Sequence, residues 1–145
     1  MKKLLLASAV TLAMSTTAYA EDIKLGIIFG FTGPIESLTP DMAKGAEAAI
    51  AEVSASGALL SGSTVTGIRA DSTCVDSAVA TANAEKLITS DKVSGIIGAD
   101  CSGVTGAILQ NVARANGMVM ISPSATSPGL STAEDDGLFF RTAPS

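Results

Sequence analysis

Histidine is absent from all 145 residues of the chain, and its absence excludes several kinds of chemistry. It removes the Ser-His and Cys-His pairs that activate a nucleophile. It also removes the side chain that binds transition metals most often. The two cysteines are too few to complete a four-ligand zinc site. We therefore expect no enzyme of those classes, no metal and no bound cofactor.

Other residue types are scarce as well, and their scarcity narrows the choice of partners. Tryptophan is absent, aromatic residues make up 3% of the chain, and the formal net charge is −5. Because an acidic surface repels phosphate groups, neither a nucleic acid nor an anionic membrane is expected as a partner. Beyond the first twenty residues, no apolar run is long enough to span a bilayer.

Those first twenty residues have the pattern of a secretory signal peptide. Lys2 and Lys3 precede an apolar run at 4–14, and the segment ends in Ala18-Tyr19-Ala20. A positive start, a short apolar centre and a small-x-small end are the three parts of such a signal. The alternative is the first core helix of a cytosolic protein. We predict that residues 1–20 are removed and that a soluble product reaches the periplasm without a lipid anchor.

The rest of the chain alternates short apolar runs with helical patterns. Strands are expected where apolar residues follow one another without a break, at 23–29, 64–70, 93–97, 118–121 and 138–141. Helices are expected to begin at Thr39-Pro40-Asp41, at Asp76 and at Ser102, with hydroxyl or carboxylate caps. Gly57 and Asn116-Gly117 are expected to end the first and third of them.

Residues that recur at helical spacing are expected to face the sheet. They are Met42, Ala46, Ala49, Ile50 and Val53, then Ala80, Ala84, Leu87 and Ile88, then Val104, Ala107, Ile108, Val112 and Ala115. Apolar strands joined by such helices predict an α/β fold, a doubly wound, mostly parallel sheet with helices on both faces, over residues 21–145. Because the chain stops at Ser145, directly after a strand, we expect this domain to be a fragment.

In open parallel sheets, ligands bind outside the carboxyl ends of the strands. The loops that follow these ends, at 30–38, 71–75, 98–103 and 122–126, are rich in glycine and hydroxyl residues and contain no lysine or arginine. Phosphate binding is therefore poorly supported. The glycine spacing at 26–33 does not match a dinucleotide fingerprint, and 98–103 does not match a hydrolase nucleophile elbow.

Two of these loops offer candidate ligand contacts. Ser102 stands where a strand leads into a helix, and a helix N-terminus favours an anion such as a carboxylate. The alternative is that the Ser102 hydroxyl only caps its helix. The loop at 122–128 contains two prolines that stiffen it. It either presents backbone and hydroxyl groups to a ligand or is an ordinary Pro/Ser turn.

Cys74 and Cys101 lie in two neighbouring loops at this edge of the predicted sheet. In an exported chain such a pair usually forms a disulfide, and two buried free thiols are the alternative. A bond at this position would also fix the loop that carries Ser102.

Several short segments occur in a characteristic order along the chain. They are Glu21-Asp22-Ile23-Lys24-Leu25, Thr32-Gly33-Pro34, Gly45-Ala46-Glu47, the two cysteines, Ile121-Ser122-Pro123-Ser124-Ala125-Thr126 and Phe140-Arg141-Thr142. Taken together with the signal peptide, they resemble the start of the leucine/isoleucine/valine-binding family of type I periplasmic binding proteins.

The resemblance implies a protein that binds an amino acid, of the branched-chain type or a related amide or small carboxylate, between two lobes. It also implies delivery of this ligand to an ABC permease of the inner membrane. Under it, residues 21–145 are an incomplete first lobe, the second lobe is absent, and the protein is a monomer and not an enzyme. One departure leaves the ligand open: relatives that bind branched aliphatic amino acids carry an aromatic residue at the position of Leu38.

The resemblance also assigns roles to individual residues. Ser102 would hold the ligand carboxylate, and Ser124 and Ala125 would offer backbone groups. Thr126 would use its hydroxyl on the polar head of the ligand, and the cysteines would form the family's disulfide. The alternatives to a transport protein are a ligand-sensing domain that feeds a receptor and an exported hydrolase.

Overall fold

The computed structural model describes residues 20–59 and 62–145, so residues 1–19 of the expected signal peptide lie outside the described residues. One parallel sheet has the strand order β2-β1-β3-β4-β5. Its strands are β1 (Asp22–Phe29), β2 (Thr64–Asp71), β3 (Gly95–Gly98), β4 (Met120–Ser122) and β5 (Phe139–Arg141). The helices are α1 (Thr39–Ala55), α2 (Ser77–Thr89), α3 (Ser102–Ile108), the π-helical turn η2 (Leu109–Ala113), α4 (Arg114–Asn116) and the 3-10 turn η3 (Pro128–Ser131). The predicted parallel α/β class is confirmed.

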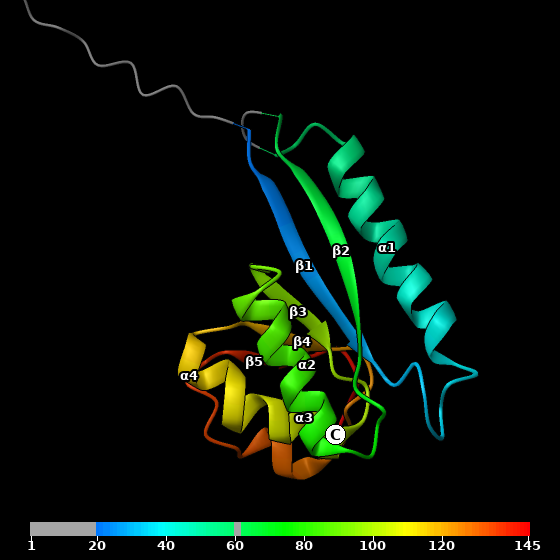
Figure 1. Cartoon of the computed structure of the whole chain (residues 1–145), viewed down its shortest axis with the longest axis vertical. Helices are drawn as coiled ribbons and strands as arrows, with labels where there is room; N and C mark the ends of the chain where they lie inside the picture. Colours follow the sequence, from blue (N-terminus) through cyan, green and yellow to red (C-terminus); the bar gives the residue numbers. More distant parts are fainter. Residues whose placement is uncertain (1–19, 60–61) are drawn as a thin grey trace, which may run out of the picture.

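Helices cover the two faces of the sheet to different extents. Ile27 and Phe29 of β1 pack with Ala43 and Ile50 of α1, whereas Ile28 between them packs with the α2 and α3 side. Figure 1 shows α1 running alongside β1 and β2, apart from the group formed by α2, α3 and α4. Alternate residues of β1 are therefore buried on opposite faces, as a doubly wound sheet requires.

On the α1 face, no helix of the described residues covers the strands β4 and β5. Ile121 and Phe140, which are paired neighbours on this face, are 45% and 53% exposed. Beside α1 lies an apolar groove of about 430 Å³. It is lined by Leu25, Phe29, Met42, Ala46, Ala49, Ile50, Val53, Val65, Ile97, Ile121, Pro123 and Thr142. Several α1 residues predicted to be buried against the sheet thus face this groove.

The start of α1 differs from the prediction. The N-cap residue is Leu38, which makes no side-chain cap, and Thr39 is the first helical residue. Thr39 is completely buried, and its hydroxyl donates to the carbonyl of Gly30 at 2.9 Å. That buried carbonyl needs a donor, and the Thr39 hydroxyl supplies it. Asp76 caps α2 as predicted, accepting from the N–H groups of the first turn.

The predicted third helix is interrupted by η2. Leu109 and Ala113 are completely buried, whereas Ala115, predicted to face the core, is exposed. A π-helical turn contains more residues than an α-helical turn, so it shifts the buried face along the chain. The helical segment ends as predicted at Gly117, which adopts the left-handed conformation (φ 61°).

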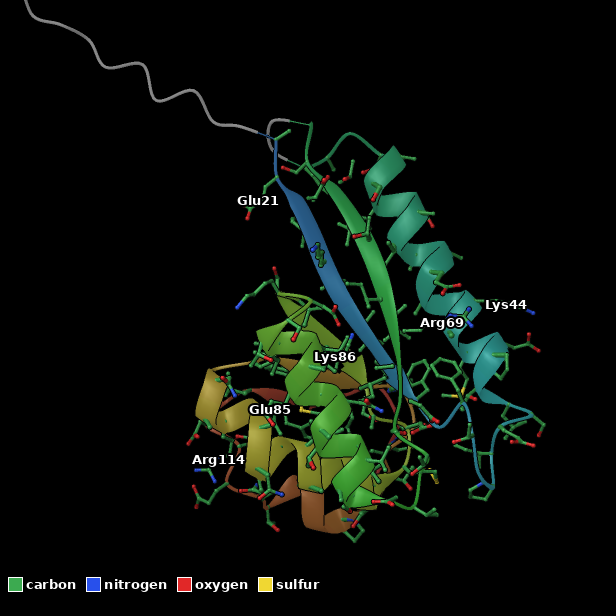
Figure 2. The ribbon with its side chains drawn as sticks, in the orientation of Figure 1. Glu21, Lys44, Arg69, Glu85, Lys86 and Arg114 are labelled. Carbon is green, nitrogen blue, oxygen red and sulfur yellow. A yellow bond between two sulfur atoms is a disulfide. The ribbon has the colours of Figure 1, made fainter. Side chains whose placement is uncertain are left out.

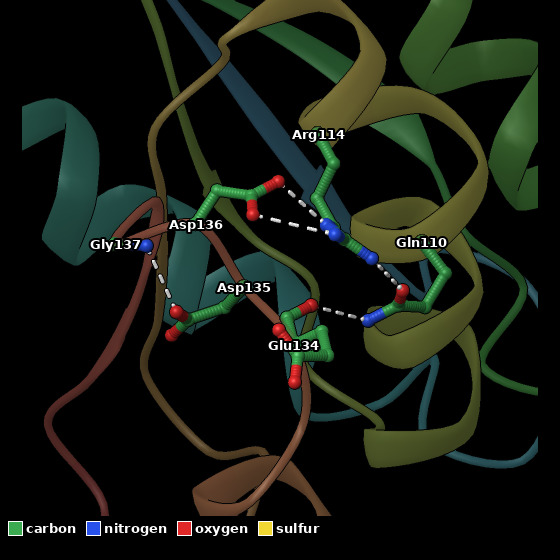
Figure 3. A network of polar contacts seen from close by, with 6 residues as sticks. All are labelled: Gln110, Arg114, Glu134, Asp135, Asp136 and Gly137. Carbon is green, nitrogen blue, oxygen red and sulfur yellow. Dashed lines mark hydrogen bonds and ion pairs between the residues drawn. The ribbon is translucent and has the colours of Figure 1, made fainter.

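The segment that leads into β5 is fixed to the helices by a polar network (Figure 3). Arg114 donates to Asp136 at 2.7 Å and to Gln110 at 2.7 Å, and Gln110 donates to the carbonyl of Glu134 at 2.8 Å. The hydrogen bond from Arg114 holds the pKa of the Asp136 carboxyl below its ordinary value. Because these groups are exposed, the network orients the segment more than it stabilises the fold.

A second charged pair joins β2 to α1. Arg69 of β2 reaches α1 and donates two hydrogen bonds to the Glu47 carboxylate, at 2.6 and 2.8 Å (Figure 2).

The described part of the chain contains no helix that combines the length and apolarity needed to cross a bilayer.

Candidate functional site

A buried carboxylate lies at the centre of the loops that follow the strands. Asp100 is 2% exposed, and its Oδ2 accepts from the Gly30 N–H at 2.7 Å. Its Oδ1 accepts from the Ser72 hydroxyl at 3.0 Å and from the Cys101 N–H at 2.9 Å. The first three loops therefore meet at one side chain. Sequence reasoning missed Asp100, and the available signal was a lone charge in the otherwise small and apolar stretch 95–101.

Ser102 lies in this cluster but does not cap its helix. Cys101 occupies the N-cap position without a side-chain cap, and Ser102 is the first residue of α3. Its hydroxyl oxygen accepts from the Ser127 N–H at 3.0 Å. Capping, which was one of the two alternatives for this residue, is therefore wrong. Within the described residues, no protein acceptor receives the Ser102 hydroxyl proton, which leaves it available to a ligand.

The fourth loop is folded back onto the third. The Ser122 hydroxyl donates to the carbonyl of Ala99 and accepts from the Ala125 N–H at 2.9 Å. The Ser124 hydroxyl donates to the carbonyl of Asp100 at 2.9 Å. Thr126 is exposed, and its hydroxyl has no partner among the described residues. Ser102 and Thr126 are thus the two predicted contact residues with hydroxyl groups left to offer.

Arg141 of β5 holds the fourth loop in place through hydrogen bonds, and sequence reasoning missed this role. Its guanidinium donates to the carbonyls of Ala125 at 3.1 Å and Ser127 at 2.9 Å, and to the Ser131 hydroxyl. Ala125 is completely buried, and its N–H is already bonded to Ser122. Ala125 therefore keeps only the second lone pair of its carbonyl for another donor.

The predicted disulfide between Cys74 and Cys101 is present. The two Cα atoms are 5.2 Å apart, and the bond joins the second loop to the third. The alternative of two free thiols is wrong. The bond lies one residue from both Asp100 and Ser102, so a covalent and a hydrogen-bonded link hold the same pair of loops.

Asp71 ties the first loop to the second. Its carboxylate accepts from the Thr32 hydroxyl at 2.5 Å, from the Thr32 N–H at 3.3 Å and from the Thr73 N–H at 2.8 Å. Partial burial raises the pKa of Asp71, but the hydrogen bonds from Thr32 and Thr73 outweigh it. The pKa of this carboxyl therefore lies below its ordinary value of 3.8.

We expect this carboxylate to make the fold sensitive to acid. Because the pKa of Asp71 is lower in the folded state, its ionised carboxylate stabilises the fold fully above the ordinary pKa. This stabilisation is lost as the pH falls through the pKa of the folded state. The free energy of unfolding, measured with urea between about pH 7 and about pH 3, should fall below about pH 4 and fall less in Asp71→Asn. High salt screens the exposed ion pairs and leaves this difference in place. An acid dependence that is the same in both proteins would contradict the assignment.

A parallel sheet with linked, polar loops at its carboxyl edge is the architecture of a small-molecule binding domain. Residues 22–145 match the family model described as periplasmic binding protein, and the chain belongs to this family. It is 34% identical over 140 residues to the Leu/Ile/Val/Thr-binding protein of Salmonella typhimurium, covering 97% of this chain and 37% of that relative. It is 35% identical to the Leu/Ile/Val-binding protein of Escherichia coli K12, with the same coverage.

The fold is similar to that of a solved family member. The branched-chain amino acid transporter substrate-binding protein of Streptococcus pneumoniae, solved in complex with isoleucine, superposes with a TM-score of 0.76 and 31% identity. The match covers 86% of this chain and 34% of that structure. The chain spans about 37% of the length of the curated relatives that it matches.

Proposed function

We propose that the chain forms the first lobe of a periplasmic solute-binding protein that presents an amino acid to an ABC permease. Residues 1–20 act as the signal peptide, so the exported product begins at Glu21. The family and the named relatives support a transport role rather than an enzymatic one. A periplasmic binding protein of this kind closes its lobes around the ligand by a hinge motion.

The observation that carries this proposal is the free hydrogen-bonding capacity at the carboxyl edge of the sheet. The Ser102 hydroxyl is fixed by the Ser127 N–H and keeps its own proton to donate to a carboxylate. Thr126 is exposed beside it on the fourth loop, with its hydroxyl unbonded within the described residues. A hydroxyl that binds a carboxylate needs no cationic side chain, which fits loops that contain no lysine or arginine.

In this proposal the two remaining candidates act through the backbone. Ser124 uses its hydroxyl on Asp100 and offers its carbonyl, and Ala125 offers the second lone pair of its own carbonyl. Both carbonyls belong to a loop that Ser122 and Arg141 hold in place, so they accept a ligand ammonium or amide without first being ordered.

The test is a nuclear magnetic resonance titration of the exported, isotope-labelled chain with L-leucine. The amides of Ser102 and Thr126 should shift with L-leucine, whereas leucinamide, which lacks the carboxylate, should leave the Ser102 amide in place. Because a hydrogen bond to a charged group contributes about 1.5–3 kcal/mol, Ser102→Ala should weaken binding about tenfold or more. Thr126→Ala should weaken it less, because Thr126 is exposed and its hydroxyl exchanges a hydrogen bond to water for one to the ligand.

Thr89→Ala serves as the matched control for loss of a hydroxyl. Thr89 lies at the end of α2, where its hydroxyl donates to the carbonyl of Glu85 at 2.8 Å. This variant should bind L-leucine as the parent chain does. Equal binding of leucinamide and L-leucine, or an unchanged affinity in Ser102→Ala, would show that the carboxylate is held elsewhere.

A further inference from the structure

We propose that Asp100 is the positioning residue of this site, and that its carboxylate sets the geometry in which the ligand-contacting hydroxyls are presented. The inference rests on the proposed function, because it concerns the same loops. Asp100 itself is not offered to the ligand: it is buried, and each of its oxygens is already bonded to the protein.

The connections of Asp100 reach all of the loops at the carboxyl edge. Its side chain holds Gly30, which is 70 positions away in the sequence, and Ser72, which is 28 positions away. Its main-chain carbonyl accepts from the Ser124 hydroxyl of the fourth loop at 2.9 Å. Because Ser102 is only two residues further on, movement of Asp100 would displace the contact residues of the third and fourth loops together.

The groups held by Asp100 have no freedom to move independently. The carbonyl of Gly30 accepts from buried Thr39, and the Ser72 N–H donates to the carbonyl of Phe29 at 2.8 Å. Ser72 is completely buried. A Cβ atom on Gly30 would lie 3.3 Å from Asp100 Oδ2 and 3.2 Å from the Cβ of Cys74, so the loops touch without spare room.

The carboxylate at position 100 fixes the geometry of the loops rather than increasing the stability of the fold. A buried charge is costly to desolvate, and none of the ion pairs among the described residues includes Asp100. What a carboxylate provides is an acceptor at both oxygens. Gly30 and Cys101 each present a backbone N–H, one to each oxygen, and an amide side chain of the same shape satisfies only one of them.

The decisive variant is therefore Asp100→Asn, studied in the exported chain. It leaves the volume of the core unchanged but turns an N–H₂ group toward either Gly30 or Cys101. We expect amide hydrogen exchange at one of these two residues to become about tenfold faster, because a buried donor without an acceptor is costly. The amides of Ile27 and Ile28 in the core strand should exchange as before. The affinity for L-leucine, measured by the same titration, should fall about tenfold.

Ser54→Ala is the matched control for loss of a side-chain acceptor. Ser54 Oγ accepts from the Val65 N–H at 2.8 Å and donates to the Val65 carbonyl at 3.0 Å, which ties α1 to β2 away from the loops. Its removal should speed exchange at Val65 without changing the affinity for L-leucine. If Asp100 had only a structural role, Asp100→Asn and Ser54→Ala would have the same effect on the affinity for L-leucine.

The outcomes separate this proposal from the proposed function. Unchanged exchange at Gly30 and Cys101 in Asp100→Asn, or an unchanged L-leucine affinity with faster exchange, would overturn the positioning role. Failure of the parent chain to respond to L-leucine would instead overturn the proposed function, while the exchange result still decides whether Asp100 anchors the loops.

A second variant keeps the test decisive if Asp100→Asn does not fold. Ser72→Ala removes one hydroxyl from Asp100 Oδ1 and leaves both backbone N–H groups bonded to the carboxylate. It should weaken L-leucine binding by a smaller factor, about threefold, because one of the three neutral donors is lost. An unchanged affinity in this variant would then overturn the proposal.

Discussion

Replacing Gly98 by alanine is expected to destabilise the chain more than replacing any other described glycine by alanine. Gly98 ends β3 with φ 138°, a conformation that L-residues rarely adopt. A Cβ atom there would lie 2.2 Å from the carbonyl oxygen of Ile28 and 2.7 Å from its Cγ2. Ile28 is the paired residue of the neighbouring strand β1. Because its carbonyl oxygen belongs to the backbone, it cannot rotate away from the added methyl group. Overpacking and the unfavourable conformation together should cost about 2–5 kcal/mol.

Urea unfolding followed by circular dichroism measures this loss, and a natural control lies in α1. Gly45 has nothing within 4 Å of an added Cβ and occupies a helix interior. Gly45→Ala should therefore stabilise the chain, by about 0.5–1 kcal/mol, because alanine loses less backbone entropy in a helix. If Gly98→Ala unfolds at the same urea concentration as the parent chain, the close approach of β3 to β1 at this residue is wrong.

The fold class could be read from the sequence because each element carries a local signal. Strands such as β1 are continuous apolar runs, and α2 begins at Asp76, whose carboxylate caps it as expected. Where prediction failed, a distant partner had changed the use of a local group. The Thr39 hydroxyl donates to the carbonyl of Gly30, and the Ser102 hydroxyl oxygen accepts from the Ser127 N–H. In both cases a hydroxyl expected to cap a helix instead bonds to a buried or half-buried backbone group outside that helix.

The central residue of the site was beyond the reach of local patterns. Asp100 bonds to Gly30 across 70 positions, and no spacing rule connects an aspartate to a glycine at that distance. The same holds for Arg141, whose targets lie 14 and 16 positions before it in a loop without regular structure. The exposure of Ile121 was equally hidden, because the sequence shows that a strand is apolar but not which strands a given helix covers.

Removing the disulfide is expected to lower the stability of the chain by about 3.5 kcal/mol, through the unfolded state. Cys74 and Cys101 are 27 positions apart, and closing a loop of this length removes conformational entropy from the unfolded chain. The native loops should persist in Cys74→Ser/Cys101→Ser, because the carboxylate of Asp100 bonds to both of them without the sulfur atoms. Urea unfolding should show a lower midpoint and a steeper dependence on urea, since the unlinked unfolded chain exposes more surface.

Two comparisons distinguish this entropic origin from a loss of native packing. The parent chain with its disulfide reduced should match the double serine variant, and Cys74→Ala/Cys101→Ala should match both, because a change in side-chain polarity is not the cause. The amide exchange of Gly30 and Ser72 near neutral pH should change only as far as global stability requires, since their bonds to Asp100 and Phe29 remain. Selective loss of protection at these residues would mean that the disulfide, and not Asp100, holds the loops together.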